Sequence, residues 1–215
     1  MKTALNLILI ISAVAFFGCS TVYYSTMEKF GYQKRDILTE RVEYARDAQI
    51  EAKNQFRSAL DKFKAVVDFK GGGLEEKYTV LKAELSLSEE KASAVSKKIS
   101  DVENVADALF SEWQKELRQY TDEDLRKQSR LKLEQTRARY DKLIGSMKTA
   151  EGKIQPVLDT FRDHVLFLKH NLNAQAVASL QKQVVSIESD VSSLIRSMES
   201  SISAANSFIT NVSRD

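Results

Sequence analysis

Four long stripes of apolar residues constrain this chain more than any other feature of its sequence. They span residues 38–66, 74–113, 133–168 and 177–198, and the spacing within each stripe alternates between three and four residues. The second stripe contains Leu74, Tyr78, Leu81, Leu85, Ser88, Ala92, Val95, Ile99, Val102, Ala106, Leu109 and Trp113. This spacing is the heptad signature of coiled-coil helices. Further apolar residues flank the stripes, which favours a bundle of several helices over a two-stranded coil.

The chain has few residues that interrupt helices, since its 215 residues include 7 glycines and 1 proline. Gly71–Gly73 permits a tight reversal and supplies a C-cap, Thr121–Asp124 is a capped acidic helix start, and Asn171–Asn173 separates the last two stripes. These breaks predict four helices, at roughly 26–70, 74–119, 122–171 and 174–212.

Gly152 and Pro156 lie inside the third stripe, but the heptad spacing continues across them. Proline removes one backbone donor and kinks a helix, so we expect a bend here and not an end. Four long helices joined by short turns fold back on one another. The predicted fold is therefore all-α, an elongated antiparallel coiled coil or four-helix bundle with long helices, formed by a single domain over residues 33–215.

The N-terminus has the pattern of a bacterial lipoprotein signal. Lys2 precedes an apolar run over residues 4–17, which is too short to span a membrane, and the run ends at Gly18 and Cys19. We interpret residues 1–18 as a signal peptide cleaved between Gly18 and Cys19, although Phe16 and Phe17 replace the usual residues before the cleavage site. The alternatives are an ordinary cleaved signal with a leftover thiol, or an uncleaved anchor.

If Cys19 is lipidated, it is the first residue of the mature protein and residues 19–32 join the lipid to the bundle. The partner of this end is then membrane lipid, through acyl chains such as palmitate on Cys19. Ser20 follows the cysteine, and by resemblance to sorting in Gram-negative bacteria a serine there favours the outer membrane. The predicted location is the cell envelope, with the protein anchored in the outer membrane and facing the periplasm.

Two stretches of the mature chain resemble a known family. The first contains Gly31, Lys34–Leu38, Arg41–Val42 and Ala45–Gln49, and the second contains Pro156–Leu158, Phe161, Asp163 and Val165–Ala174. Together they resemble a bacterial family of unknown function, domain-of-unknown-function family 2959. The resemblance covers nearly all of the mature chain. It implies a helical, lipoprotein-like protein and carries no assigned activity.

Few residues are candidates for chemistry. His164 and His170 are six residues apart, without metal-ligand spacing, and His164 occupies a heptad position where a polar residue can set the register of the core. Gly71–Gly73 is followed by no Gly-Lys-Ser/Thr, so a turn is favoured over a phosphate cradle. We expect no catalytic residues, no cofactor and no metal. The formal net charge of +2 provides no field to attract nucleic acid.

Two surface features are more suggestive. Between residues 117 and 148, five acidic residues stand against nine basic ones, which are Arg118, Arg126, Lys127, Arg130, Lys132, Arg137, Arg139, Lys142 and Lys148. We call this the basic stretch; it is either an ordinary charged exterior or a surface for anionic lipid or an acidic partner. The last helix is rich in serine, a mediocre helix former. Its small side chains suit either burial in the bundle or the docking of a partner.

The function that these features favour is non-enzymatic: a cell-envelope lipoprotein acting as a coiled-coil scaffold, spacer or adaptor, tethered by lipidated Cys19. Its partner would be another envelope protein or a second copy of itself. One alternative is a periplasmic binding module that holds an apolar ligand or lipid in a cleft near Phe161, His164 and Phe167. Another is a membrane-surface protein whose basic stretch contacts lipid headgroups.

Overall fold

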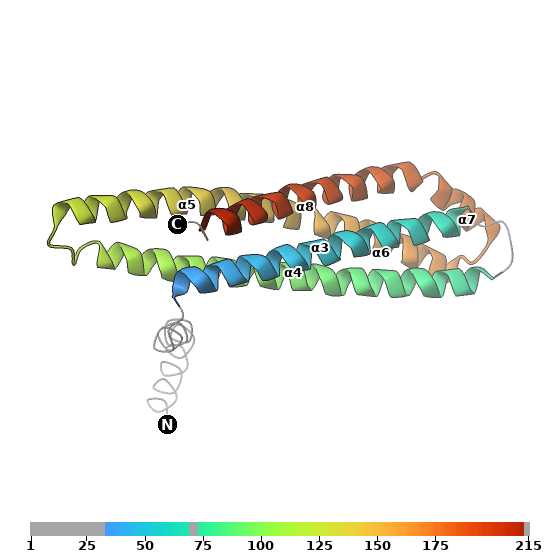
Figure 1. Cartoon of the computed structure of the whole chain (residues 1–215). Coiled ribbons are helices and arrows are strands. Elements are labelled where there is room, and N and C mark those ends of the chain that lie inside the picture. Colours follow the sequence, from blue (N-terminus) through green and yellow to red (C-terminus); the bar gives the residue numbers. More distant parts are fainter. Residues whose placement is uncertain (1–32, 69–72, 213–215) are drawn as a thin grey trace, which may run out of the picture.

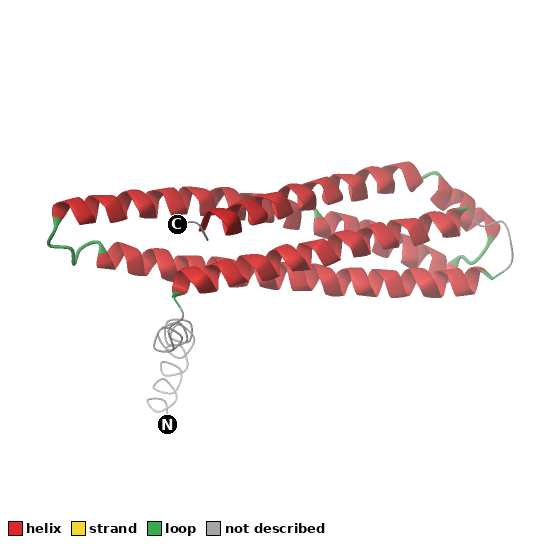
Figure 2. Ribbon diagram, viewed as in Figure 1, coloured by secondary structure: helices red, strands yellow, loops and turns green. Residues whose placement is uncertain are grey.

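The computed structural model describes residues 33–68 and 73–212, and its regular elements within those ranges are all α-helices (Figure 2). They are α3 (Lys34–Val67), α4 (Leu74–Glu116), α5 (Glu123–Glu151), α6 (Ile154–His170), α7 (Ala174–Gln181) and α8 (Val184–Val212). The predicted all-α bundle is confirmed.

The long helices surround one core (Figure 1). α3 packs against α4 and α8, α5 packs against α4 and α8, and α6 continues the direction of α5 along α4. This order places α4 and α8 at opposite corners of the bundle. α4 has 43 residues, and at about 1.5 Å per residue it is roughly 65 Å long, so the molecule is a rod.

The heptad stripes form the core. Every position of the first stripe is buried: Leu38, Val42, Ala45, Gln49, Ala52, Phe56, Ala59, Phe63 and Val66. The same stripe pattern continues from α5 into α6, where Ala150, Ile154 and Val157 are all buried. Burial of these side chains is the main source of stability, because each fully buried large apolar side chain contributes about 1.5–3 kcal/mol.

The predicted helix over 122–171 is divided into two helices, so the expected bend is a break. α5 ends at Glu151, and α6 begins at Ile154, two residues before Pro156. Proline is tolerated in the first turn of a helix, because the backbone N–H that it lacks would have no intrahelical partner there. Its ring therefore fits an existing helix start, and the core register is preserved across the break.

The predicted helix over 174–212 is also divided, at Lys182 and Gln183, where the sequence has neither glycine nor proline. The other ends differ less from the predictions: α4 ends at Glu116, and α5 is capped by the Asp122 side chain, which accepts hydrogen bonds from the Asp124 and Leu125 amides. Gly73, expected near a helix C-cap, instead precedes α4 with φ at +96°, a conformation that favours glycine.

One end of the rod is a two-helix projection. The hairpin formed by α4 and α5 extends beyond the beginning of α3 and the end of α8 (Figure 1). The beginning of α3 is held beside this end by an ion pair of 2.7 Å between Lys34 Nζ and Glu112 Oε2. In the part of the chain that the structure describes, none of the helices combines the length and apolar character that crossing a membrane requires.

Candidate interaction groove

The residues predicted to carry the lipid, Gly18 and Cys19, lie outside the described residues. The residues expected near an apolar cleft do lie within them, but they do not converge. Phe161 is buried and packs edge-on against Phe63, with ring centroids 6.2 Å apart, whereas the Phe167 side chain is exposed. These aromatic rings therefore do not line a common pocket.

His164 lies half-buried at its heptad position, with its ring centroid 5.4 Å from that of Phe63. Burial lowers the pKa of its imidazole, and the nearby Asp163 carboxylate opposes that shift. His170 is exposed at the end of α6. Over residues 33–68 and 73–212, no group of three or more His, Cys, Asp or Glu side chains is placed to hold a metal ion.

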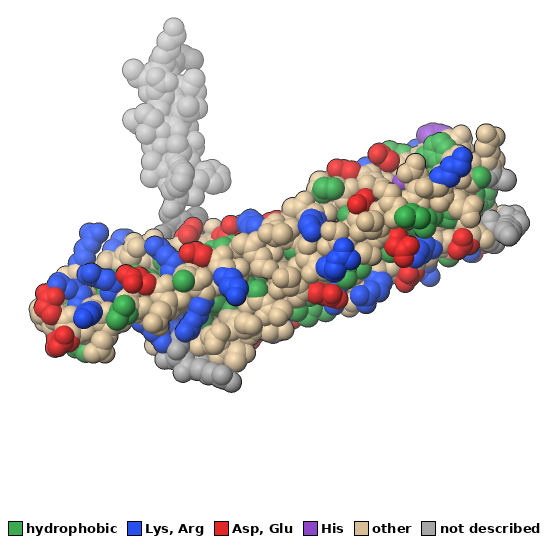
Figure 3. Space-filling view, turned by 90° about the horizontal axis from the view of Figure 1, so that it is seen from above, with side chains coloured by type: hydrophobic (Ala, Val, Ile, Leu, Met, Phe, Trp, Pro, Cys, Tyr) green, Lys and Arg blue, Asp and Glu red, His purple; other side chains and the backbone are tan. Residues whose placement is uncertain are grey.

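The basic stretch does not form one surface. Lys148 turns toward α4, where its Nζ lies 2.9 Å from a Glu103 carboxylate oxygen, and this bond raises the pKa of Lys148. The Arg137 guanidinium stacks over the Phe110 ring at 5.0 Å, and Arg126 pairs with Glu123. Three of the nine basic residues are therefore engaged within the α4–α5 hairpin. In Figure 3, blue side chains gather over the free end of that hairpin, together with red ones.

Arg139 and Lys142 of the same stretch face a different neighbour, the serine-rich helix α8. Together the two helices form a groove that consists of two adjoining hollows, of about 450 and 500 Å³, which share Ser146 and Ser200. The first is lined by Arg139, Lys142, Leu143, Ser146, Ser200, Ser203, Ala204, Ser207, Phe208 and Asn211. The second is lined by Gly145, Ser146, Thr149, Lys153, Ser193, Arg196, Ser197 and Ser200. We call the two hollows the α5–α8 groove.

The α5–α8 groove is electrostatically one-sided. Its lining residues include four cations, Arg139, Lys142, Lys153 and Arg196, and none of these described lining side chains is a carboxylate. Two carboxylates of α8 instead point toward α3, where Glu188 lies 2.6 Å from Lys64 and Glu199 lies 3.4 Å from Lys53. The packing of α8 therefore directs these negative charges toward α3, away from the groove.

The groove is otherwise lined with small side chains. Serines at i, i+3 and i+4 spacing leave room above the helix backbones, and a Cβ added at Gly145 would meet no atom within 4 Å. Figure 3 views the α5 and α8 side of the rod and shows a broad tan band of uncharged polar side chains and backbone along its middle. The helices α7 and α8 contain ten serines, and only Ser201 among them is buried. Burial in the bundle is therefore not their general role.

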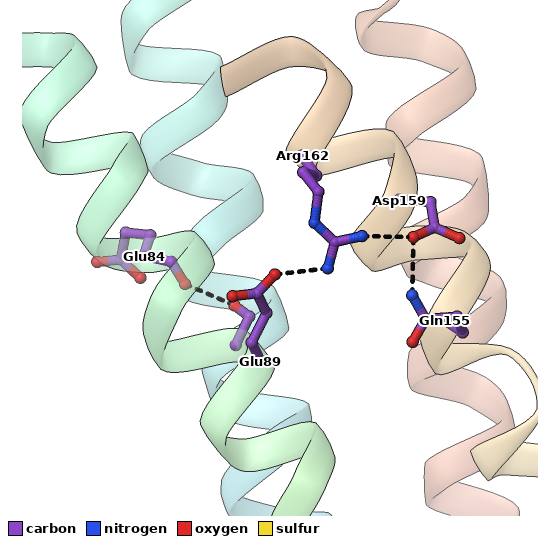
Figure 4. A network of polar contacts seen from close by, with 6 residues as sticks. Glu84, Glu89, Gln155, Asp159 and Arg162 are labelled. Atoms are coloured by element: carbon purple, nitrogen blue, oxygen red, sulfur yellow. Dashed lines mark hydrogen bonds and ion pairs between the residues drawn. The ribbon is translucent and has the colours of Figure 1, made fainter. Parts of the chain in front are cut away.

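The seam between α4 and α6 has a hollow of similar size, about 500 Å³, but its charges are paired. Figure 4 shows Arg162 between two carboxylates, with nitrogen–oxygen distances of 2.6 Å to Glu89 and 2.7 Å to Asp159. Gln155 donates a further hydrogen bond to Asp159. This network fastens α6 to α4 and raises the pKa of Arg162, chiefly through its bond to Glu89.

The sequence had marked Arg139, Lys142 and the serines of the last helix as two separate surface features. The structure brings them together in the α5–α8 groove and adds Lys153 and Arg196 to them. Arg196 could have been noticed, because it is the single Lys or Arg within α8. Lys153 stood at the predicted bend, where its direction depends on how the helix breaks.

A family model described as a protein of unknown function (DUF2959) matches residues 23–212 of the chain. This match covers most of the sequence and confirms the family resemblance seen in its two characteristic stretches. The comparison with curated proteins found no match, and neither did the comparison with solved structures.

Proposed function

The chain belongs to the DUF2959 family of proteins of unknown function, and we propose that it is a non-enzymatic cell-envelope lipoprotein. In this proposal its helical rod acts as a scaffold, spacer or adaptor. Lipidated Cys19 tethers it to the outer membrane, so that the rod faces the periplasm. The observation that carries the proposal is a long bundle with one continuous heptad core, because such a rod sets a distance and presents long side surfaces.

The position of the tether supports this arrangement. The beginning of α3 lies at the end of the rod that bears the α4–α5 hairpin, where Lys34 pairs with Glu112. A lipid on Cys19 would therefore keep the hairpin end near the membrane. The opposite end, where α6 meets α7, would then extend away from the anchor.

The chemistry of the α5–α8 groove supports binding and not catalysis. Two of the hydroxyls that line it donate to the helix backbone: Ser197 donates to the Ser193 carbonyl at 3.1 Å and Ser207 to the Ser203 carbonyl at 3.0 Å. A catalytic serine needs a base within hydrogen-bond reach to take its proton. None of the described residues that line the groove is a His, Asp or Glu that could act as such a base.

The test is membrane fractionation of cells that express the full-length chain or Cys19→Ala, combined with labelling by a palmitate analogue and in-cell crosslinking. The proposal expects label and outer-membrane sedimentation in the parent chain, both lost in Cys19→Ala. It also expects one envelope partner, or the chain itself, to be crosslinked in the parent and lost in the variant. Unlabelled parent protein that fractionates as Cys19→Ala does would contradict the tether.

A further inference from the structure

We infer that the α5–α8 groove is a docking site for an acidic helical segment of a partner protein. This inference rests on the proposed adaptor role and gives it a location and a chemistry. It joins two independent properties of the groove, which are the excess of cations among its described lining residues and its shape.

The cations that line the groove indicate that its occupant is negatively charged. Lys142 and Arg196 are exposed on opposite walls of the groove, and Lys153 donates to Ser193 across it at 3.1 Å. On the neighbouring α3 seam the cations of this protein meet carboxylates of α8, so the absence of carboxylates among the groove's lining residues is local. Complementary charge on a partner would steer association and fix its register.

The positions of the cations along the groove indicate how far apart the carboxylates of an occupant should lie. Arg139 and Lys142 lie at one end of the groove, and Lys153 and Arg196 line the other hollow. From Arg139 to the end of α5 at Glu151 the groove follows 12 residues of helix, or about 18 Å at 1.5 Å per residue, and Lys153 lies in the break just beyond. An occupant that satisfies both ends carries carboxylates near its two ends, with small or apolar residues between them.

Shape identifies a helix. A furrow between two packed helices accepts the side-chain ridge of a third helix, and small residues let the backbones approach closely. Gly145 supports this interpretation, because glycine in a helix interior is less favourable than alanine and the bundle itself leaves space for a Cβ there. Leu143, Ala204 and Phe208 provide apolar contact at one end.

Other anionic occupants fit less well. Carbohydrate sites commonly use an exposed aromatic ring, whereas the one aromatic residue among the described lining residues, Phe208, is 3% exposed. A membrane surface is nearly flat over the width of this rod, and the groove cations lie along a furrow between helices. A helix bearing carboxylates can follow that furrow and reach Lys142, Lys153 and Arg196.

The experiment measures binding of two synthetic peptides to the purified mature chain by fluorescence anisotropy at low ionic strength. The first is a helix-forming peptide of about 15 residues with paired glutamates near each end and alanine and leucine between them. The second has the same composition with a central proline, which breaks the helix. We expect the helical peptide to bind at least about tenfold more tightly.

Two variants test the charge and the shape separately. The double change Lys142→Glu and Arg196→Glu reverses charge in the groove; its matched control, Lys82→Glu with Lys97→Glu, makes the same charge change on α4. Ser200→Phe fills the middle of the groove without changing charge; its control is Ser100→Phe on α4. The altered residues are exposed, which favours folding, and circular dichroism melting checks each variant. We expect each groove variant to weaken binding about tenfold or more, and each control to change it less than about twofold.

The outcomes separate the competing occupants. Equal binding of both peptides, or binding that tolerates Ser200→Phe, would overturn the helical occupant. Failure of the helical peptide to bind would overturn the inference, and so would binding of phosphatidylglycerol vesicles that the charge-reversed groove variant abolishes. Self-association of the mature chain lost in that variant would assign the groove to a second copy. The membrane tether is tested separately by Cys19→Ala, so it can hold while the groove inference fails.

Discussion

The α4–α6 seam and the α5–α8 groove both lie between neighbouring helices and are lined by charged side chains. They differ in whether those charges are paired within the chain. Both are surface furrows with hollows of about 500 Å³ between neighbouring helices of one bundle. Across the first, Arg162 joins Glu89 to Asp159, and the charges are satisfied within the chain. In the second, four cations share the lining with hydroxyls and no carboxylate among the described lining residues. A charged seam can thus fasten a bundle or be left available to another molecule.

Truncating a buried leucine that lines either hollow is expected to have the largest effect on stability. Similar losses would show that the α4–α6 seam and the α5–α8 groove share one core. Leu158 lines the α4–α6 hollow at 3% exposure, and Leu143 lines the α5–α8 groove at 1% exposure. Leu158→Ala and Leu143→Ala should each lower the free energy of unfolding by about 2–5 kcal/mol, because each leaves a cavity. Urea unfolding followed by circular dichroism measures both. A loss below about 1 kcal/mol in one variant would mean that its seam stands apart from the core.

Replacing Gly145 with alanine should stabilise the protein, because the glycine has no role in the internal packing that the structure describes. A Cβ at Gly145 meets nothing within 4 Å, so Gly145→Ala should raise the free energy of unfolding by about 0.5–1 kcal/mol. Thermal melting of the mature chain measures the change. Gly152→Ala is the contrasting variant, since its Cβ would lie 3.4 Å from the Lys148 carbonyl oxygen at the end of α5. An unchanged or lower stability in Gly145→Ala would show that the groove at this position is already filled.

Removing one arginine from each seam tests the difference in charge pairing directly. Arg162→Ala leaves Glu89 and Asp159 without their shared cation, but these side chains are about two-fifths exposed or more. Their pairing therefore contributes little to stability, and high salt should reduce the small loss. Arg196→Ala breaks no ion pair among the described residues and should lower the free energy of unfolding by less than Arg162→Ala does. Equal losses in the two variants would contradict the comparison.

Lowering the pH should destabilise the protein through His164 on α6 but not through the α5–α8 groove. We expect this effect to be the smallest of those considered. Burial favours the neutral form of His164 on α6, so its pKa in the folded protein lies below the ordinary value of 6.5. As pH falls through that value the unfolded chain binds more protons, and the folded state loses stability. Unfolding should therefore become easier between about pH 7.5 and pH 5.5, and His164→Gln should reduce the change. Arg196→Ala, which removes a cation of the α5–α8 groove and keeps His164, is the control and should leave the pH dependence intact.

The heptad stripes were sufficient to predict the fold because coiled-coil packing depends on local spacing. Every position of the first stripe is buried, and the antiparallel bundle follows from short connections between long helices. Helix ends were less predictable. The break before Pro156 falls where the proline can occupy a first helical turn, and the break at Lys182 and Gln183 occurs without any residue that disfavours a helix.

The candidate site was predictable only in pieces. Arg139 and Lys142 belonged to a recognisable basic stretch, and the serines of α8 were evident by composition. Their meeting depends on the rotation of α5 against α8, which sends Lys148 toward Glu103 and leaves Lys142 at the groove. Arg126, Arg137 and Lys148 of the basic stretch are engaged within the α4–α5 hairpin, so net charge along the sequence was a poor guide to the charge that the surface presents.

The sequence by itself determined the helical class, the core positions and the family of this protein, because heptad spacing and characteristic residues are written along the chain. Only the tertiary structure decided which charges neutralise one another. Glu188 and Glu199 pair with Lys64 and Lys53 because α8 packs against α3, and the cations on the other side of α8 are left facing a groove. Electrostatic pairing acts over a few ångströms in space, and residues that are distant in sequence reach that range only when helices pack side by side.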